Sequence, residues 1–163
     1  MQVDRTALRA DIKSAFPTAS LRPASIKDMI AAPYRDNDDA YGLAAVLYGR
    51  PWADIPIADL FFHREMLFAL SPDAYRVYVP AYLTACLAHD SSLDTYGPDL
   101  NEYLLNSVIV EDNAREVYRT TTTARLSVLT PAQRAVMTAV VQYMKERWRE
   151  RRADEALRQL AAY

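Results

Sequence analysis

The stretch LSPDAYRVYVPAYLTACL, residues 70–87, combines a helix-start signal with an aromatic-rich helical segment. Ser71 is suited to cap the first turn, and Pro72 fits the first helical position because an N–H group there needs no partner. Asp73 is favoured beside the positive end of the helix dipole. Pro80 removes one helical hydrogen bond, so we expect the helix to kink or restart just before it. The pattern predicts a long helix and describes packing rather than chemistry.

The chain on either side of this stretch also has helical periodicity. Apolar residues recur at helical spacing in residues 4–16, 36–47 and 99–110, and Thr130 to Gln133 form a capping box that opens a last helix. Residues 120–123 are four threonines, which favour a strand locally, but residues 117–128 match helical spacing and no partner strand is evident. We therefore predict a helix there as well.

These elements predict an all-α fold, a single compact domain of about six to seven helices over residues 1–163. A long charged helix ends the chain, and residues 148–163 are expected to project from the domain as a helical extension. Leu157 and Leu160 are its only later apolar anchors.

A family resemblance rests on the central stretch and on two flanking pieces. Residues 70–83, LSPDAYRVYVPAYL, resemble Leu-Ser-Pro-Glu-Ala-Phe-Arg-Tyr-Tyr-Leu-Pro-Ala-Tyr-Leu, the central motif of a family of uncharacterised bacterial proteins. Residues 47–52, LYGRPW, are similar to its upstream Leu-x-Gly-x-x-Trp, and residues 129–133, LTPAQ, to its downstream Leu-Thr-x-x-Gln. The resemblance implies a bacterial, mainly helical domain of unknown function, and it transfers no catalytic residue.

The composition fits a globular domain. A chain of 163 residues can bury about two-thirds of its unfolded surface without disulfides. The single cysteine, Cys86, lies in an apolar run and is expected to be a buried, inert thiol. The first 16 residues lack the apolar core of a secretory signal, and no stretch approaches the ~20 apolar residues of a membrane helix. We therefore expect a cytoplasmic protein with no membrane partner.

The residues suited to catalysis are few, and we predict no catalytic residue, cofactor or metal site. His63 and Glu65 are two positions apart and point to different faces of a helix, and His89 is expected at a helix end. The three glycines stand alone, outside any phosphate-binding loop. The acids of residues 36–39 lack the later Gly and Glu of a calcium loop.

The charges are unevenly distributed along the chain. Residues 77–114 hold six acidic residues and no Lys or Arg, whereas residues 115–163 hold ten basic and five acidic residues. In the last helix the two signs alternate, which favours a solvated face over a nucleic-acid site. The acids of residues 77–114 form a negative surface if they share a face. The predicted partner-binding residues of this acidic, tyrosine-bearing surface are Asp90, Asp94, Tyr96, Asp99, Glu102, Tyr103, Glu111 and Asp112.

The function predicted from this pattern is non-enzymatic binding of another protein. Opposite charge speeds encounter and selects partners, and aromatic side chains slow dissociation. A bacterial immunity protein that neutralises a basic toxin by covering its active site would have such a surface. One alternative is an enzyme or small-ligand protein with a site near His63 and Glu65, and another is self-association through the last helix. Tyr75, Tyr78 and Tyr82 share a helical stripe. We expect most of the eleven tyrosines to be half-buried at the edge of the core, with interface anchors as the alternative for some of them.

Overall fold

The computed structural model describes residues 4–88, 97–110, 114–149 and 151–163. The α-helices in this part of the chain are α1 (Arg5–Ala15), α2 (Asp38–Leu47), α3 (Ile57–Phe62), α4 (Pro72–Ala88), α5 (Gly97–Val108), α6 (Glu116–Ser127), α7 (Pro131–Trp148) and α8 (Ala153–Ala161). Short 3₁₀ helices in the first half are η1 (Ile26–Met29), η2 (Ala32–Tyr34), η3 (Trp52–Asp54) and η4 (Arg64–Ala69). The all-α class is confirmed for these residues, where the extended pairing is a single bridge between Ile30 and Leu70. The helices are slightly more numerous than predicted.

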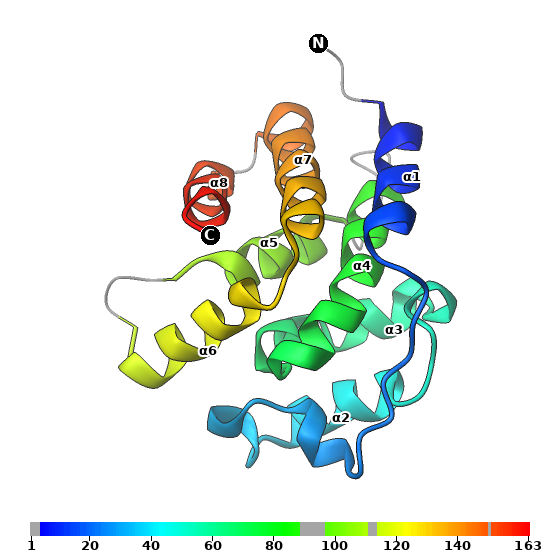
Figure 1. The fold of residues 1–163 in the computed structure, drawn as a ribbon, viewed down its shortest axis with the longest axis vertical. Coiled ribbons are helices and arrows are strands. Elements are labelled where there is room, and N and C mark those ends of the chain that lie inside the picture. Colours follow the sequence, from blue (N-terminus) through cyan, green and yellow to red (C-terminus); the bar gives the residue numbers. More distant parts are fainter. Residues whose placement is uncertain (1–3, 89–96, 111–113, 150) are drawn as a thin grey trace.

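Helix α4 lies at the centre of the fold and contacts α1, α5, α6 and α7 (Figure 1). It begins as expected, because the N–H of Ala74 donates to Ser71 Oγ at 3.4 Å. Of the expected kink or restart before Pro80, the restart is wrong, since α4 runs without interruption from Pro72 to Ala88. Most helical stability in proteins comes from tertiary packing, so one missing hydrogen bond does not end a helix that is buried on nearly every side.

The tyrosines of α4 lie inside the core, and for these three the expectation of half-buried positions at its edge is wrong. Tyr75, Tyr78 and Tyr82 are all fully buried. The Tyr78 hydroxyl donates to the Leu47 carbonyl at 2.6 Å and accepts from the Leu21 N–H at 3.0 Å. A buried hydroxyl with a partner is compatible with a core position, and Tyr75 has one as well, since its hydroxyl lies 3.0 Å from Ser107 Oγ.

Side chains cap the first and seventh helices, and the cap of the seventh is the predicted one. Asp4 accepts the N–H of Thr6 at 2.8 Å at the start of α1. The Thr130 and Gln133 capping box is complete, with distances of 3.2 Å and 3.0 Å. Gln133 also donates Nε2 to the Ala15 carbonyl at 3.3 Å, so the start of α7 is bonded to the end of α1.

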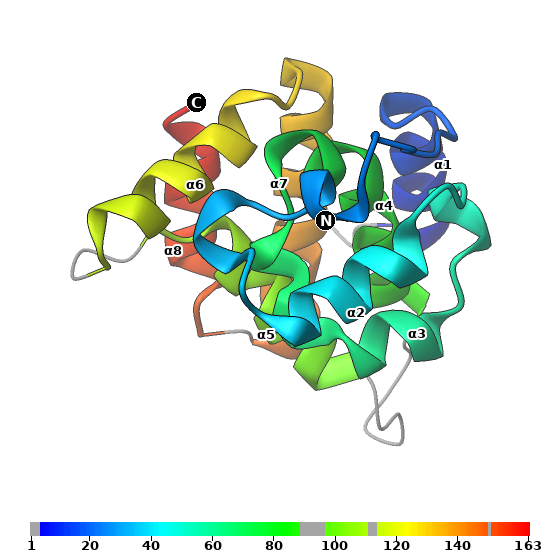
Figure 2. The same ribbon diagram turned by 90° about the horizontal axis from the view of Figure 1, so that it is seen from below.

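Helix α6 confirms the helical prediction for the threonine-rich segment. It lies at the periphery of the molecule, and its N-terminal end points away from the other helices (Figures 1 and 2). Thr121 Oγ1 donates back to the Val117 carbonyl at 2.8 Å, which satisfies a hydroxyl without a tertiary contact. The side chain of Val117 is 48% exposed. Helix α6 is therefore less completely packed than α4.

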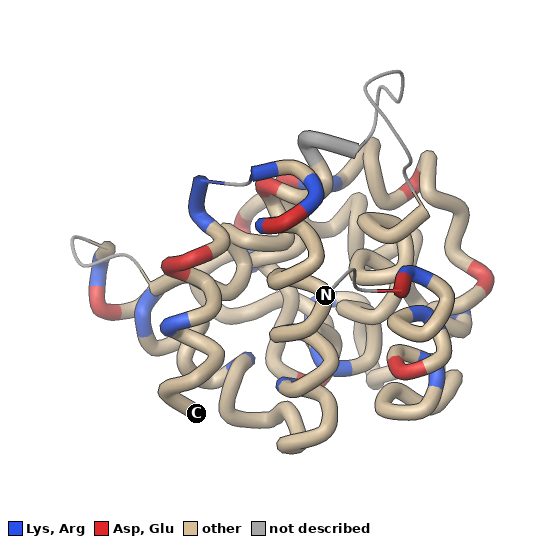
Figure 3. The backbone as a smooth tube through the Cα atoms, turned by 90° about the horizontal axis from the view of Figure 1, so that it is seen from above, with Lys and Arg blue, Asp and Glu red and all other residues tan. Residues whose placement is uncertain are grey.

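The last residues fold back onto the domain instead of projecting from it. Arg149 adopts a left-handed conformation with φ 55° at the end of α7, and α8 then packs on α7 and α5. Ala153, Ala156 and Leu160 are buried, because α8 has a narrow apolar stripe that the charge-rich sequence obscures. Basic and acidic segments alternate at this turn (Figure 3), and Lys145 of α7 pairs with Asp154 of α8 at 2.6 Å.

Two further predictions concern single features of the described residues. Cys86 is buried, as expected for an inert thiol. Within the described part of the chain, no helix combines the length and apolar character that crossing a membrane requires.

Candidate functional site

The predicted acidic surface falls largely outside the described residues. This applies to Asp90, Asp94, Tyr96, Glu111 and Asp112, and also to His89. The backbone of Asp99 belongs to α5, but its side chain is also outside the description. Glu102 and Tyr103 are described, the first exposed and the second partly buried.

Tyr103 joins α5 to η4 through a small polar cluster. Its hydroxyl donates to Glu65 Oε1 at 3.2 Å, and burial, followed by the negative charge of Glu65, raises the pKa of Tyr103. The Arg64 guanidinium lies 4.3 Å from the centre of the Phe61 ring and 5.8 Å from that of Tyr103. A guanidinium against aromatic faces is held by cation–π attraction. The result is a fixed aromatic and charged surface, with the Glu65 carboxylate on it.

Phe62 ends α3 directly before this cluster in the chain and is 77% exposed, although it is a large apolar side chain. Its ring meets the edge of His63 at a centroid distance of 4.8 Å. We call Phe62, His63, Arg64, Glu65 and Tyr103 the aromatic surface. The sequence carries one signal for Phe62: successive helical side chains point about 100° apart, so Phe61 can pack against the core while Phe62 does not.

His63 and Glu65, the alternative site predicted from the sequence, have different partners. A Cβ added at Gly42 would come within 2.7 Å of His63 Cε1, so the imidazole is packed closely against α2. Glu65 instead accepts the hydroxyl of Tyr103. Among the described residues, no group of three or more His, Cys, Asp or Glu side chains is suited to hold a metal ion.

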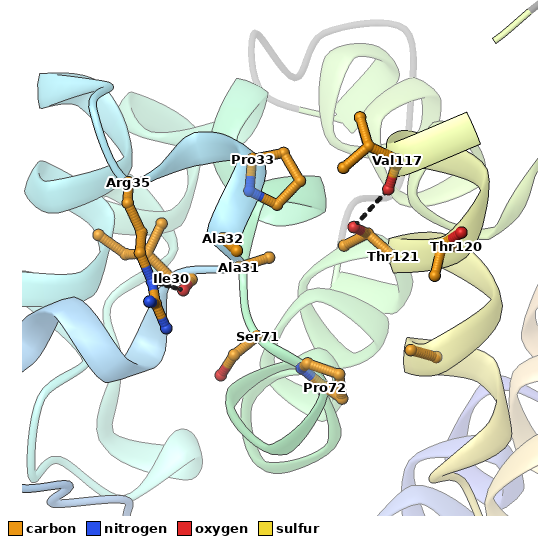
Figure 4. Close-up of a pocket in the computed structure, with 11 residues that line it drawn as sticks. Ile30, Ala31, Ala32, Pro33, Arg35, Ser71, Pro72, Val117, Thr120 and Thr121 are labelled. Carbon is orange, nitrogen blue, oxygen red and sulfur yellow. Dashed lines mark hydrogen bonds between the residues drawn. The ribbon is translucent and has the colours of Figure 1, made fainter. Parts of the chain in front are cut away.

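Cavities surround α6 on several faces. One of about 410 Å³ lies between residues 30–35 and α6, with Ser71 and Pro72 at the start of α4 between them (Figure 4). A second, of about 330 Å³, lies between α6, the C-terminal half of α5 and the rings of Tyr34 and Phe68. A third, of about 410 Å³, separates α6 from Gln159 and Tyr163. These volumes are in the range of small-molecule sites.

The fold and these surfaces define an all-α domain with an exposed aromatic surface and cavities around one peripheral helix. The chain belongs to the Family of unknown function (DUF6714), whose model matches residues 4–163. The resemblance to an uncharacterised family is thereby confirmed, while the bacterial origin and the central motif stay predictions. No curated protein and no solved structure matches the chain.

Proposed function

We propose that this protein is a non-enzymatic binding protein of the cytoplasm that recognises another protein through the aromatic surface. The observation that carries the proposal is the 77% exposure of Phe62. An exposed aromatic side chain beside ordered polar groups is typical of binding hot spots, where an apolar anchor is desolvated by the partner. Arg64 and Tyr103, fixed by their mutual contacts, lose little conformational entropy when a partner binds.

The charge around the surface favours a basic partner. Glu65 and Glu102 are both exposed, and residues 77–114 contain six acids without a single basic residue. A basic protein would approach such a surface faster than a neutral one, and its association would weaken as salt screens the attraction. In its finer form the proposal is an immunity protein that neutralises a cognate basic toxin by covering its active site.

The test is co-expression of the tagged chain with the product of the adjacent gene, followed by purification and titration calorimetry. We expect a stoichiometric complex whose affinity falls with rising salt. Phe62→Ala is expected to weaken it at least tenfold, because truncation of an aromatic hot spot typically costs about 2 kcal/mol or more, and about 1.4 kcal/mol corresponds to a factor of ten. The double variant Asp94→Lys, Asp99→Lys is also expected to weaken the complex relative to the wild type, without unfolding the domain.

Val117→Ala is the matched control, because Val117 is another exposed apolar residue and lies on α6. It should leave the affinity unchanged. Equal affinity of Phe62→Ala and the wild type would contradict the assignment of the surface. If the chain is an immunity protein, the product of the adjacent gene must arrest growth when expressed alone, and co-expression of this chain must restore growth. Failure of that rescue contradicts the immunity function but leaves the proposed binding surface untouched.

A further inference from the structure

The most unusual side chain of the described structure is Arg125, near the end of α6. It is 1% exposed, yet its guanidinium makes one hydrogen bond, from Nη2 to Thr122 Oγ1 at 2.8 Å. Nε and Nη1 are buried and have no acceptor among the described residues. The Tyr75 ring also lies near the guanidinium, with its centroid 5.5 Å from Cζ. Proteins seldom bury a cation without an anion beside it, because the desolvation cost is large.

The environment of Arg125 shows the consequence of this burial. Desolvation lowers the pKa of its guanidinium, and the phenol groups of Tyr75 and Tyr34 only partly oppose that effect. Arginine nevertheless keeps its proton in proteins, so the charge must be compensated in another way. Among the described residues, no carboxylate is bonded to Arg125.

Arg125 lines the 330 Å³ cavity, and the other walls are suited to a ligand with an apolar body. Tyr34 lies at the centre of an aromatic wall, with its ring centre 5.1 Å from that of Phe68 and 5.4 Å from that of Tyr118. Ile109 and Val110 of the α5 end extend the apolar part. No acidic side chain is among the described lining residues.

Two further arginines border the same cavity. Arg119 is exposed and lies on α6, about one and a half turns before Arg125. Arg152 is held by Asn106 Oδ1 at 2.5 Å and by Glu155 at 3.5 Å, so part of its charge is already compensated. The cavity thus has arginine side chains near one aromatic wall. A ligand that carries an anionic group on a ring could pair with the arginines and pack its ring on that wall.

We propose that the cavity beside Arg125 binds a small organic anion, a carboxylate or a phosphate attached to an aromatic or apolar body. The anion accepts hydrogen bonds from the unpartnered guanidinium nitrogens of Arg125, and Arg119 adds a second positive charge. The body of the ligand packs on Tyr34, Phe68 and Tyr118. This site is separate from the aromatic surface and does not depend on it.

Access to Arg125 requires a small shift of α6, and the packing of α6 makes such a shift inexpensive. Cavities adjoin the helix on different faces, and its central residues 120–123 are threonines, which are poor helix formers. Elements with few buried apolar contacts open first in native proteins.

The test is an NMR titration of the full chain with phenylacetate, phenyl phosphate and the neutral analogue phenylacetamide. We expect saturable shifts of the Arg125 Nε–H signal with at least one anion, and at least tenfold weaker binding of phenylacetamide, since a charged hydrogen bond is lost. The tighter of the two anions identifies the ligand class. Binding of phenylacetamide as tight as that of the better anion, or no binding of either anion, overturns the proposal.

Variants separate the site from a purely structural arginine. Arg125→Met is expected to weaken anion binding at least tenfold while the free protein becomes equally or more stable, because a buried unpaired charge is replaced by an apolar side chain of similar length. Arg119→Gln, at an exposed position, is expected to weaken binding severalfold, and Arg115→Gln, exposed on the same helix, is the matched control without effect.

Two carboxylates, Glu111 and Asp112, follow Val110 in the sequence and lie outside the described residues. They are therefore tested as internal partners of Arg125 with the variant Glu111→Gln, Asp112→Asn. If this variant and Arg125→Met both lower stability, and their combination lowers it no further, the anion is internal and the proposal is wrong. Unchanged stability of the double amide variant supports an external anion.

Discussion

Replacing Tyr78 by phenylalanine removes one oxygen atom from the middle of the core and leaves its volume nearly unchanged. That oxygen makes two hydrogen bonds, as donor to the Leu47 carbonyl and as acceptor of the Leu21 N–H. Leu47 keeps a second donor, because its carbonyl also accepts the N–H of Arg50 at 3.1 Å. Leu21 loses the acceptor of its N–H. The losses of the two hydrogen bonds therefore have different costs.

The magnitude follows from these two losses. Loss of the hydrogen bond to Leu47 costs about 1 kcal/mol, since the Leu47 carbonyl still accepts the N–H of Arg50. The unsatisfied N–H of Leu21 costs roughly a further 1–2 kcal/mol. Tyr78→Phe should therefore lower the free energy of unfolding by about 2–3 kcal/mol. In a domain of this size that corresponds to a fall of roughly 4–12 °C in the melting temperature.

Tyr82 supplies a control on the same helix, one turn further on. It is equally buried, but its hydroxyl has no partner among the described residues. Tyr82→Phe should leave the free energy of unfolding unchanged or raise it slightly, because an unsatisfied hydroxyl is removed. Urea denaturation of both variants measures the difference. Values for the two variants that agree within about 0.5 kcal/mol would refute the reasoning.

Two further predictions concern alkaline pH and a helix cap. Burial raises the pKa of Tyr75 and of Tyr82 in the folded protein. Their stabilising effect is thus complete below the pKa of about 10 in the unfolded chain and is lost as the pH rises through the pKa in the folded protein. Urea denaturation between pH 8 and 11 should show a free energy of unfolding that falls above about pH 10, and less steeply in Tyr82→Phe. A flat profile contradicts this. Thr130→Ala should cost about 1 kcal/mol, because the Gln133 N–H loses its cap. Thermal unfolding of Thr130→Ser, which keeps the hydroxyl, is the control, and equal melting temperatures of the two variants would argue against the capping contribution.

The sequence predicted best the features that depend on local chemistry. The cap at Thr130 involves neighbouring residues, so the residue types alone indicate the start of that helix. The segment around Thr121 was also predicted as a helix, since its apolar spacing outweighed its local strand preference. The all-α class follows from such patterns added along the chain.

Features that depend on the packing of distant elements were not predictable in the same way. Whether α4 passes through Pro80 depends on the helices around it, and no local rule contains that information. The burial of Arg125 gave no signal, because an arginine in the last turn of a helix is ordinarily solvated and favourable there. The turn at Arg149 was missed because a left-handed arginine is rare, and glycine or asparagine usually occupies that place.

The bond between Gln133 and Ala15, together with the packing of α1 on α7, has a consequence for the order in which the domain forms on the ribosome. Helix α1 can pack on α4 at an early stage, but α7, its second partner, follows only after more than a hundred further residues. Until then the faces of α1 and α4 that α7 covers stay exposed to water, chaperones and proteases. Folding to completion therefore requires that α7 has been synthesised, and nascent chains that stop before α7 should be degraded rather than accumulate as smaller stable domains.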